Sequence, residues 1–179
     1  AGDSIGNTID TLNKCLQANH QLQEMGISQP DSAYSLIMPE SYVGLPFMDV
    51  DPSEKEKRKK EKAAQQLKAI CEDLKERKTG ISHLTEGPLP WFFTHIVGGF
   101  FEHVLITDKR FHVVEERCVK CGICANVCPV GDISGGKGKR PVWLHHDDCL
   151  TCFSCYHHCP HHAIEFGRQT QKKGQYYYK

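Results

Sequence analysis

Eight of the ten cysteines lie in two runs with one spacing, C-x-x-C-x-x-C-x-x-x-C-P. The runs are Cys118, Cys121, Cys124 and Cys128 before Pro129, and Cys149, Cys152, Cys155 and Cys159 before Pro160. Gaps of two residues let three thiols converge on one side of a tight loop. The proline after each fourth cysteine donates no N–H and turns the chain, so the fourth thiol reaches elsewhere. The fold of this region therefore depends on the group that these thiols bind or on the bonds that they form.

Disulfides, zinc and iron–sulfur clusters all use clustered thiols. Cysteines three residues apart make strained disulfide pairs, no signal peptide is visible, and a chain of 179 residues does not need such staples. Structural zinc sites usually draw two close pairs of ligands from separate knuckles, rather than three evenly spaced cysteines and a remote Cys-Pro. The spacing therefore favours two 4Fe-4S clusters, in which soft thiolates complete the coordination of iron.

From about residue 110 to 168 the chain resembles a bacterial two-cluster ferredoxin, and the domain is assigned to 110–179. The resemblance implies crossed ligation, with one cluster held by Cys118, Cys121, Cys124 and Cys159 and the other by Cys149, Cys152, Cys155 and Cys128. The two runs repeat with an offset of 31 residues, from 118 to 149. The flanking apolar segments predict two hairpins of a pseudo-two-fold fold, 111–114 with 163–166, and Ile133 with 141–144.

The first 80 residues have a different pattern. Ile9, Leu12 and Leu16 predict a helix over about 7–19, an apolar run predicts a strand over 33–38, and Asp51-Pro52-Ser53-Glu54 predicts the start of a helix reaching about Lys78. Its basic residues alternate with glutamates, which indicates a solvated face rather than a nucleic-acid patch. Its packing stripe is Ala63, Leu67, Ile70, Cys71 and Leu74, and we expect Cys15 and Cys71 to be small buried hydrophobes.

Gly2 to Asn7, Leu36 to Tyr42, the long helix and the cysteine-rich end together resemble the bacterial flavodoxin/ferredoxin fusion family. The resemblance implies an α+β chain with a partial flavodoxin-like α/β segment over 1–80. It also makes Gly2, Asp3 and Ser4 a flavin-facing loop. Ser4 to Thr8 superficially copies a flavodoxin phosphate loop, but no buried strand precedes it, so FMN is expected only with a complete flavodoxin-like domain.

A single strand between two helices leaves its backbone N–H and C=O groups without hydrogen-bond partners on a neighbouring strand. We expect either a missing N-terminal segment or a neighbouring chain, as in a homo-oligomer, to complete the sheet. Residues 81–109 are interpreted as an apolar docking linker, because the run from Trp91 to Phe101 is too short to span a bilayer. A helix on the membrane surface is the alternative. The six histidines near the second run are interpreted as exposed flanking residues rather than ligands.

Lys plus Arg and Asp plus Glu number 22 each, so net charge indicates neither nucleic acid nor an anionic membrane as partner. Thiolate ligands suit a reducing interior, and a soluble cytoplasmic protein is expected. The sequence therefore predicts an electron-transfer protein that relays single electrons to or from a redox protein or flavoprotein. An oxidoreductase acting on a small substrate or quinone, and a redox-sensing structural module, remain alternatives, and no residue is assigned a catalytic role.

Overall fold

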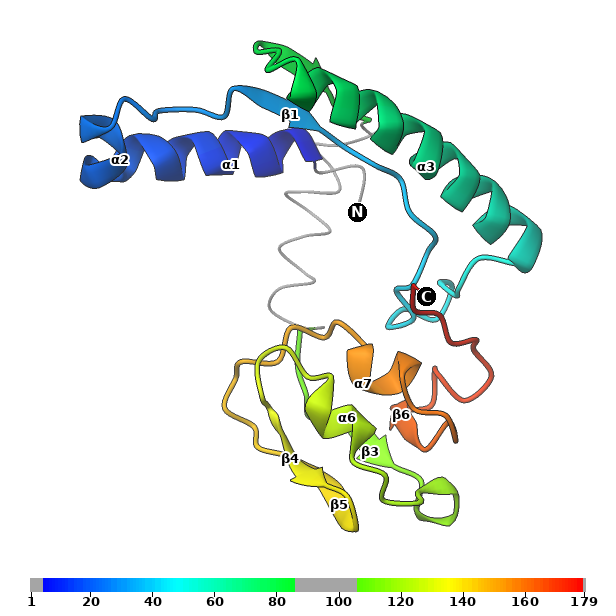
Figure 1. Cartoon of the computed structure of the whole chain (residues 1–179). Coiled ribbons are helices and arrows are strands. Elements are labelled where there is room, and N and C mark those ends of the chain that lie inside the picture. Colours follow the sequence, from blue (N-terminus) through cyan, green and yellow to red (C-terminus); the bar gives the residue numbers. More distant parts are fainter. Residues whose placement is uncertain (1–4, 86–105, 179) are drawn as a thin grey trace. The chain divides into compact units, whose positions relative to one another are not determined.

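The computed structural model describes residues 5–85 and 106–178 (Figure 1). These residues form two compact units, the first made of residues 5–39 and 53–85 and the second of residues 40–52 and 106–178. The grouping differs from the ranges expected from the sequence, because residues 40–52 join the cysteine-rich unit. The expected flavin-facing loop at Gly2 to Ser4 and most of the expected linker, 86–105, lie outside the described residues. No described helix combines the length and apolar character that crossing a bilayer requires.

The first unit contains two parallel strands. Its elements are α1 (Ile5–Ala18), α2 (His20–Glu24), β1 (Ser32–Tyr34), α3 (Ser53–Lys75) and β2 (Ile81–His83). Ser32 lies opposite Ile81 and Tyr34 lies opposite His83. Parallel strands need a crossover connection, and α3 lies in the one between β1 and β2. The first unit is therefore built on a β-α-β arrangement, as expected of an α/β sheet.

The prediction of a single strand over 33–38 was wrong. β1 is shorter, and β2, which is only three residues long after Gly80, lies at the start of the segment interpreted from the sequence as a linker. The pairing extends one residue further, since the Ser35 amide donates to the His83 carbonyl at 3.0 Å. At the end of α3, Asp73 accepts from the Tyr34 hydroxyl at 3.3 Å and pairs with Lys78 at 2.9 Å. These contacts tie the end of the helix to β1.

Most of the predicted packing stripe of α3 lies exposed. Ala63 is buried, but Leu67 is 49% and Leu74 60% exposed. The expectation that Cys15 and Cys71 are buried was also wrong, because both thiols are exposed. A sheet of two short strands offers too little surface to cover the apolar sides of two helices. The first unit therefore leaves apolar helix surface uncovered.

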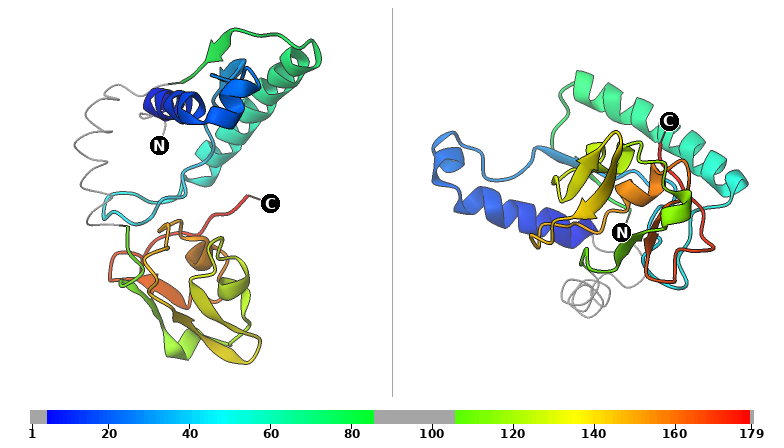
Figure 2. Two further views of the ribbon diagram at one scale, coloured as in Figure 1. Left: turned by 90° about the vertical axis from the view of Figure 1, so that its left-hand side faces the viewer. Right: turned by 90° about the horizontal axis from the view of Figure 1, so that it is seen from below.

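The second unit is built from two antiparallel strand pairs and two short helices (Figure 2). Its elements are β3 (Phe111–Val113), η4 (Glu115–Arg117), α6 (Ile123–Asn126), β4 (Ile133–Gly136), β5 (Lys139–Trp143), α7 (Ser154–His157) and β6 (Ile164–Phe166). β3 pairs with β6, placing Phe111 opposite Phe166, and β4 pairs with β5, placing Ile133 opposite Trp143. Both pairings expected from the 31-residue repeat are therefore confirmed.

The repeat extends to the backbone conformation of the cysteine loops. Four pairs of residues separated by 31 have positive φ angles in both copies: Lys120 and Thr151 (56° and 47°), Gly122 and Phe153 (82° and 60°), Gly131 and His162 (69° and 47°), and Gly136 and Gly167 (141° and 59°). For residues with a side chain this conformation costs roughly 1–2 kcal/mol each. The second run adopts it with threonine, phenylalanine and histidine, so the surrounding structure must impose the loop shape.

Aromatic rings fill the centre of the second unit. Phe111 stacks on Trp143 with ring centroids 5.7 Å apart, and Phe166 lies 4.7 Å from Phe111. Phe153, which is 1% exposed, meets Phe166 edge to face at 5.2 Å. Phe153 lies between two cysteines of the second run, so the core packs directly against that loop.

Residues 40–52, here called the strap, complete this core. Val43 is fully buried, and the Tyr42 ring meets Phe153 edge to face at 5.3 Å. The strap is also bound to the C-terminal tail, because Lys173 donates to the Val43 carbonyl at 3.0 Å and the Gly174 amide donates to Asp49 at 3.0 Å. The second unit therefore includes a segment that lies more than fifty residues before its first strand in the sequence.

His157 joins the strap to the tail. Its Nδ1 accepts from the Tyr176 amide at 3.2 Å, so its Nε2 carries the hydrogen and donates to the Ser41 carbonyl at 2.7 Å. The residue is 4% exposed, so the interpretation of this histidine as an exposed flanking residue was wrong, and burial lowers the pKa of its imidazole. The ring is therefore held neutral by two hydrogen bonds that its protonated form could not both make.

We expect His157→Ala to lower the free energy of unfolding by about 1–3 kcal/mol at pH 7.5, because it leaves two backbone groups without partners. Since the folded pKa is lowered, the contribution of His157 is present above its unfolded pKa, near 6.5, and declines as the pH falls below it. The difference in the free energy of unfolding between the variant and the wild type should therefore become smaller toward pH 5.5. Anaerobic denaturant titrations measure it, with the exposed His112→Ala as control. A difference that stays constant with pH would contradict the neutral-histidine assignment.

Candidate iron–sulfur site

Two cavities in the second unit are each lined by four cysteines. The first cavity is lined by Cys118, Cys121, Cys124 and Cys159, together with Arg117, Lys120, Ile164 and other residues. Three of these cysteines come from the first run and one from the second. Ile164 begins β6, and Pro141 of β5 completes one wall. The structure thus brings together the four residues that sequence reasoning grouped as one ligand set.

The second cavity mirrors the first. It is lined by Cys128, Cys149, Cys152 and Cys155, with Phe111, Ile133, Trp143 and Phe153 among its apolar wall residues. Here three cysteines come from the second run and Cys128 from the first. Ile133 and Ile164 stand at equivalent positions of the repeat, and each lines one cavity, as the sequence predicted.

The short helices position the buried cysteines. Cys124 lies in α6 and Cys155 in α7, and each of these helices begins after a residue with positive φ, Gly122 or Phe153. Backbone N–H groups then face sulfur: the Ala163 amide donates to Cys159 Sγ at 3.2 Å. Such donors stabilise negative charge on a metal-bound thiolate. The loops therefore provide polar backbone groups inside otherwise apolar cavities.

Burial disfavours the ionised form of three of these thiols. It raises the pKa of Cys124 and of Cys155, and neighbouring cysteines of the same cavity raise both further. Burial also raises the pKa of Cys149. A strongly positive group bound in the cavity would favour their thiolate forms. Iron, a thiophilic metal, is such a group, so the donor sets fit an iron–sulfur cluster.

Each cavity offers four thiols, which is the number that a cubane binds, with one thiolate on each iron atom.

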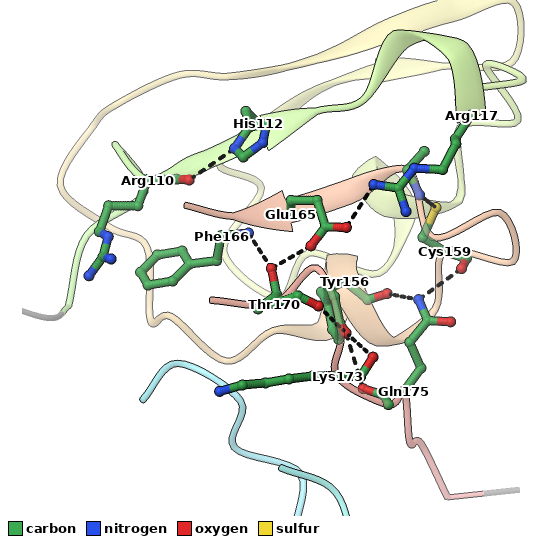
Figure 3. A network of polar contacts seen from close by, with 12 residues as sticks. Arg110, His112, Arg117, Tyr156, Cys159, Glu165, Phe166, Thr170, Lys173 and Gln175 are labelled. Carbon is green, nitrogen blue, oxygen red and sulfur yellow. Dashed lines mark hydrogen bonds and ion pairs between the residues drawn. The ribbon is translucent and has the colours of Figure 1, made fainter. Parts of the chain in front are cut away.

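A buried polar network holds Cys159 and the start of the first run (Figure 3). Arg117, directly before Cys118, pairs with Glu165 at 2.7 Å, and the Thr170 hydroxyl donates to the same carboxylate at 2.5 Å. Gln175 donates to the Cys159 carbonyl at 2.9 Å. Glu165 is only 2% exposed, so burying its carboxylate would be costly without these partners. Sequence reasoning missed this network, although an acidic residue inside the apolar segment Ala163 to Phe166 was a signal for it.

The tail also surrounds the hydroxyl of Tyr156. Three backbone carbonyls lie within 3.3 Å of this group, and the closest belongs to Lys173 at 2.8 Å. Burial raises the pKa of Tyr156 to about 12. The hydroxyl therefore stays protonated and donates to the tail, which fixes α7 beneath the second cavity.

Two buried carboxyl groups lie beside the second cavity. Asp132 lines the cavity and is 2% exposed, and Asp108 is 3% exposed. Burial raises the pKa of Asp132, and the neighbouring Asp108 carboxylate raises it further. His145 Nδ1 lies 2.7 Å from a carboxylate oxygen of Asp108. Neither aspartate was predicted as a site residue, because isolated acidic residues between apolar segments carry no distinctive pattern.

The fold and the two cavities define a duplicated domain of the iron–sulfur type, with four cysteines lining each cavity. A family model described as a 4Fe-4S dicluster domain matches residues 109–164, which contain all eight of these cysteines. The chain is 34% identical over 70 residues to a ferredoxin of Streptomyces griseus and 54% identical over 28 residues to a ferredoxin of Megasphaera elsdenii. It is 34% identical over 53 residues to an uncharacterized protein in the rpl9-rpl11 intergenic region of Porphyra purpurea.

The matches cover 38%, 16% and 27% of this chain, in the order Streptomyces, Megasphaera and Porphyra, and 65%, 52% and 71% of those relatives. The chain thus spans just under two thirds of the length of the Streptomyces ferredoxin. It belongs to the family of proteins with a ferredoxin-type 4Fe-4S dicluster domain. The matched family region lies entirely within the second unit.

We expect Gly122→Ala to disrupt the first cavity. A Cβ atom at Gly122 would lie 2.6 Å from the Gly136 backbone, and the φ angle of 82° adds strain. Gly131→Ala is the matched control, because Gly131 also has positive φ but open space around it. After anaerobic reconstitution, iron per chain should fall toward half in the first variant and stay near the wild-type value in the second. Equal iron in the two variants would show that the close contact with Gly136 is unimportant.

Proposed function

We propose that the protein is an electron carrier in which two 4Fe-4S clusters relay single electrons. The observation that carries the proposal is that each cavity gathers three cysteines from one run and the fourth from the other. When bound, a cubane accepts or releases one electron at a potential that depends on hydrogen bonds and solvent exposure. The chain supplies the thiolates, the backbone donors and the apolar walls.

The two cavities are close neighbours. Cys124, of the first cavity, contributes to raising the pKa of Cys155, of the second, and α6 and α7 pack together. An electron that enters at one cavity therefore has a short path to the other through the centre of the domain. Clusters of this kind and their thiolate ligands suit a reducing compartment such as the cytoplasm.

Potentiometry tests the carrier function. The anaerobic protein, titrated with a low-potential reductant and followed by electron paramagnetic resonance, should take up about two electrons per chain reversibly. It should then return them to a one-electron acceptor without loss of iron. Clusters that cannot be reduced reversibly would contradict the proposal and favour a structural or sensing module.

Crossed ligation is the second part of the proposal. Wild-type protein should contain about eight iron and eight sulfide per chain. Cys128→Ala should then alter the same cluster as Cys149→Ala, because the two residues line one cavity. Cys159→Ala should alter the same cluster as Cys118→Ala.

The spectrum of the cluster that remains in each variant shows which of the two clusters was altered. The control is Cys71→Ala, a change at an exposed cysteine of α3, which should keep both clusters. If Cys128→Ala instead matched Cys118→Ala, each run would hold its own cluster. Zinc without sulfide in the wild type would overturn both parts.

For the first unit we propose a partial flavodoxin-like sheet that further strands complete. The proposal is supported by the parallel β-α-β arrangement and by the exposed Leu67 and Leu74 on α3. A complete domain of this kind would hold a flavin as electron donor or acceptor for the clusters. The strand and phosphate loop that hold FMN in such domains have no counterpart among the described residues.

Titration of the chain alone with FMN should therefore show no stoichiometric binding. Light scattering should show association through the uncovered apolar surface, and Leu67→Gln with Leu74→Gln should reduce this association. Quenching of flavin fluorescence and the scattering mass measure the two effects. A monomer that binds one FMN tightly would mean that this chain already contains a working phosphate site.

A further inference from the structure

The two cavities differ at their outer edges, although the repeat relates them. At the first cavity Lys120 lines the wall, and Val119 is 58% exposed beside it. In the second copy the equivalents are Thr151, which is 2% exposed, and Leu150, which is 58% exposed. Both edges thus present an apolar side chain between two cysteines, but only the first presents a lysine next to it.

Two further lysines lie near the first cavity. The Lys120 carbonyl accepts from the Gly138 amide at 2.8 Å, which holds the turn between β4 and β5 against the loop of the first run. Gly122 approaches this turn so closely that a Cβ atom there would lie 2.8 Å from the Lys137 nitrogen. Lys137 and Lys139 of the turn are both exposed. Lys120, Lys137 and Lys139 are called the lysine edge below.

No ion pair among the described residues neutralises the lysine edge. Within residues 5–85 and 106–178, none of its three side chains pairs with a carboxylate. The neighbouring Arg117 and Arg140 are paired with Glu165 and Glu115. The lysine edge therefore carries three positive charges that no ion pair among the described residues neutralises.

The second cavity has the opposite character. Among the described residues that line it there is no Lys or Arg, and Asp132 is in its wall. Exposed Asp147 and Asp148 come directly before Cys149. Of the lysine edge, only Lys137 has a basic counterpart in the repeat, Arg168, because Lys120 and Lys139 correspond to Thr151 and Thr170. The basic edge is therefore a property of one end of the domain.

Resting on the proposed carrier function, we propose that the lysine edge is the docking surface for an acidic redox protein, which exchanges electrons through the first cavity. Val119 provides an apolar contact at the centre, and Cys121, which lines the first cavity, is itself exposed. The lysines attract a partner whose cofactor is surrounded by carboxylates and orient it toward this end. A basic partner is disfavoured here by like charge.

The test compares two triple variants with the same change in net charge. Lys120→Gln, Lys137→Gln and Lys139→Gln remove the lysine edge, whereas Lys109→Gln, Arg168→Gln and Lys172→Gln remove three exposed basic residues that do not line the first cavity. Stopped-flow measures electron transfer from each reduced protein to an acidic flavodoxin and to basic cytochrome c. Equal iron content shows that both variants retain their clusters.

At low ionic strength the first variant should transfer electrons to the flavodoxin at least about tenfold more slowly than wild type, and salt should slow the wild type far more than this variant. The second variant should stay within about twofold of wild type. Transfer to cytochrome c should not slow in either. The proposal is overturned if the first variant matches wild type, if both variants slow equally, or if cytochrome c slows as much as the flavodoxin. Failure of the wild type to reduce either acceptor would instead overturn the carrier function, and the docking proposal with it.

Discussion

The pairing of β3 with β6 and of β4 with β5 is the constraint on which the rest of the second unit depends. Each pair joins the chain before one cysteine run to the chain after the other run. Because Cys128 and Cys159 lie just before β4 and β6, the pairing carries each fourth cysteine to the opposite cavity. Neither set of four thiols can assemble without both halves of the repeat, so strand pairing and cofactor binding support each other.

The strands and helices of the second unit are too small to cover their own core. Four short strands and two helices of four residues leave the outer side of Phe153 and α7 uncovered, and the strap and the tail cover it. Polar contacts hold both segments, and several involve groups with almost no exposure, such as Glu165 and His157. Buried polar groups are costly unless each has its partner, so these contacts select one arrangement of strap and tail.

How far the sequence predicts the structure differs between the two units. In the second unit, spacing fixed the candidate ligands and the 31-residue repeat predicted the strand pairs, because cysteine and proline positions constrain the backbone locally. The strap escaped prediction, since Val43 joins the core through contacts more than sixty residues away and nothing in its neighbourhood indicates this. In the first unit, amphipathic patterns predicted α1 and α3 but not β2. They also predicted burial for side chains of these helices that the structure shows to be exposed. Periodicity shows which face of a helix is apolar, not whether anything covers that face.

The duplication also explains how two nearly identical loops acquire different surroundings. Gly122 leaves room for the turn between β4 and β5 to approach the first run, and this turn brings Lys137 and Lys139 with it. Phe153 occupies the equivalent place in the second run, fills the core and provides the surface on which Tyr42 of the strap packs. A single exchange of glycine for phenylalanine within the repeat thus accompanies both differences: a polar turn beside one cavity and an aromatic core beside the other. Because cluster potential depends on nearby charge and solvent exposure, two sites with the same ligands need not have the same potential.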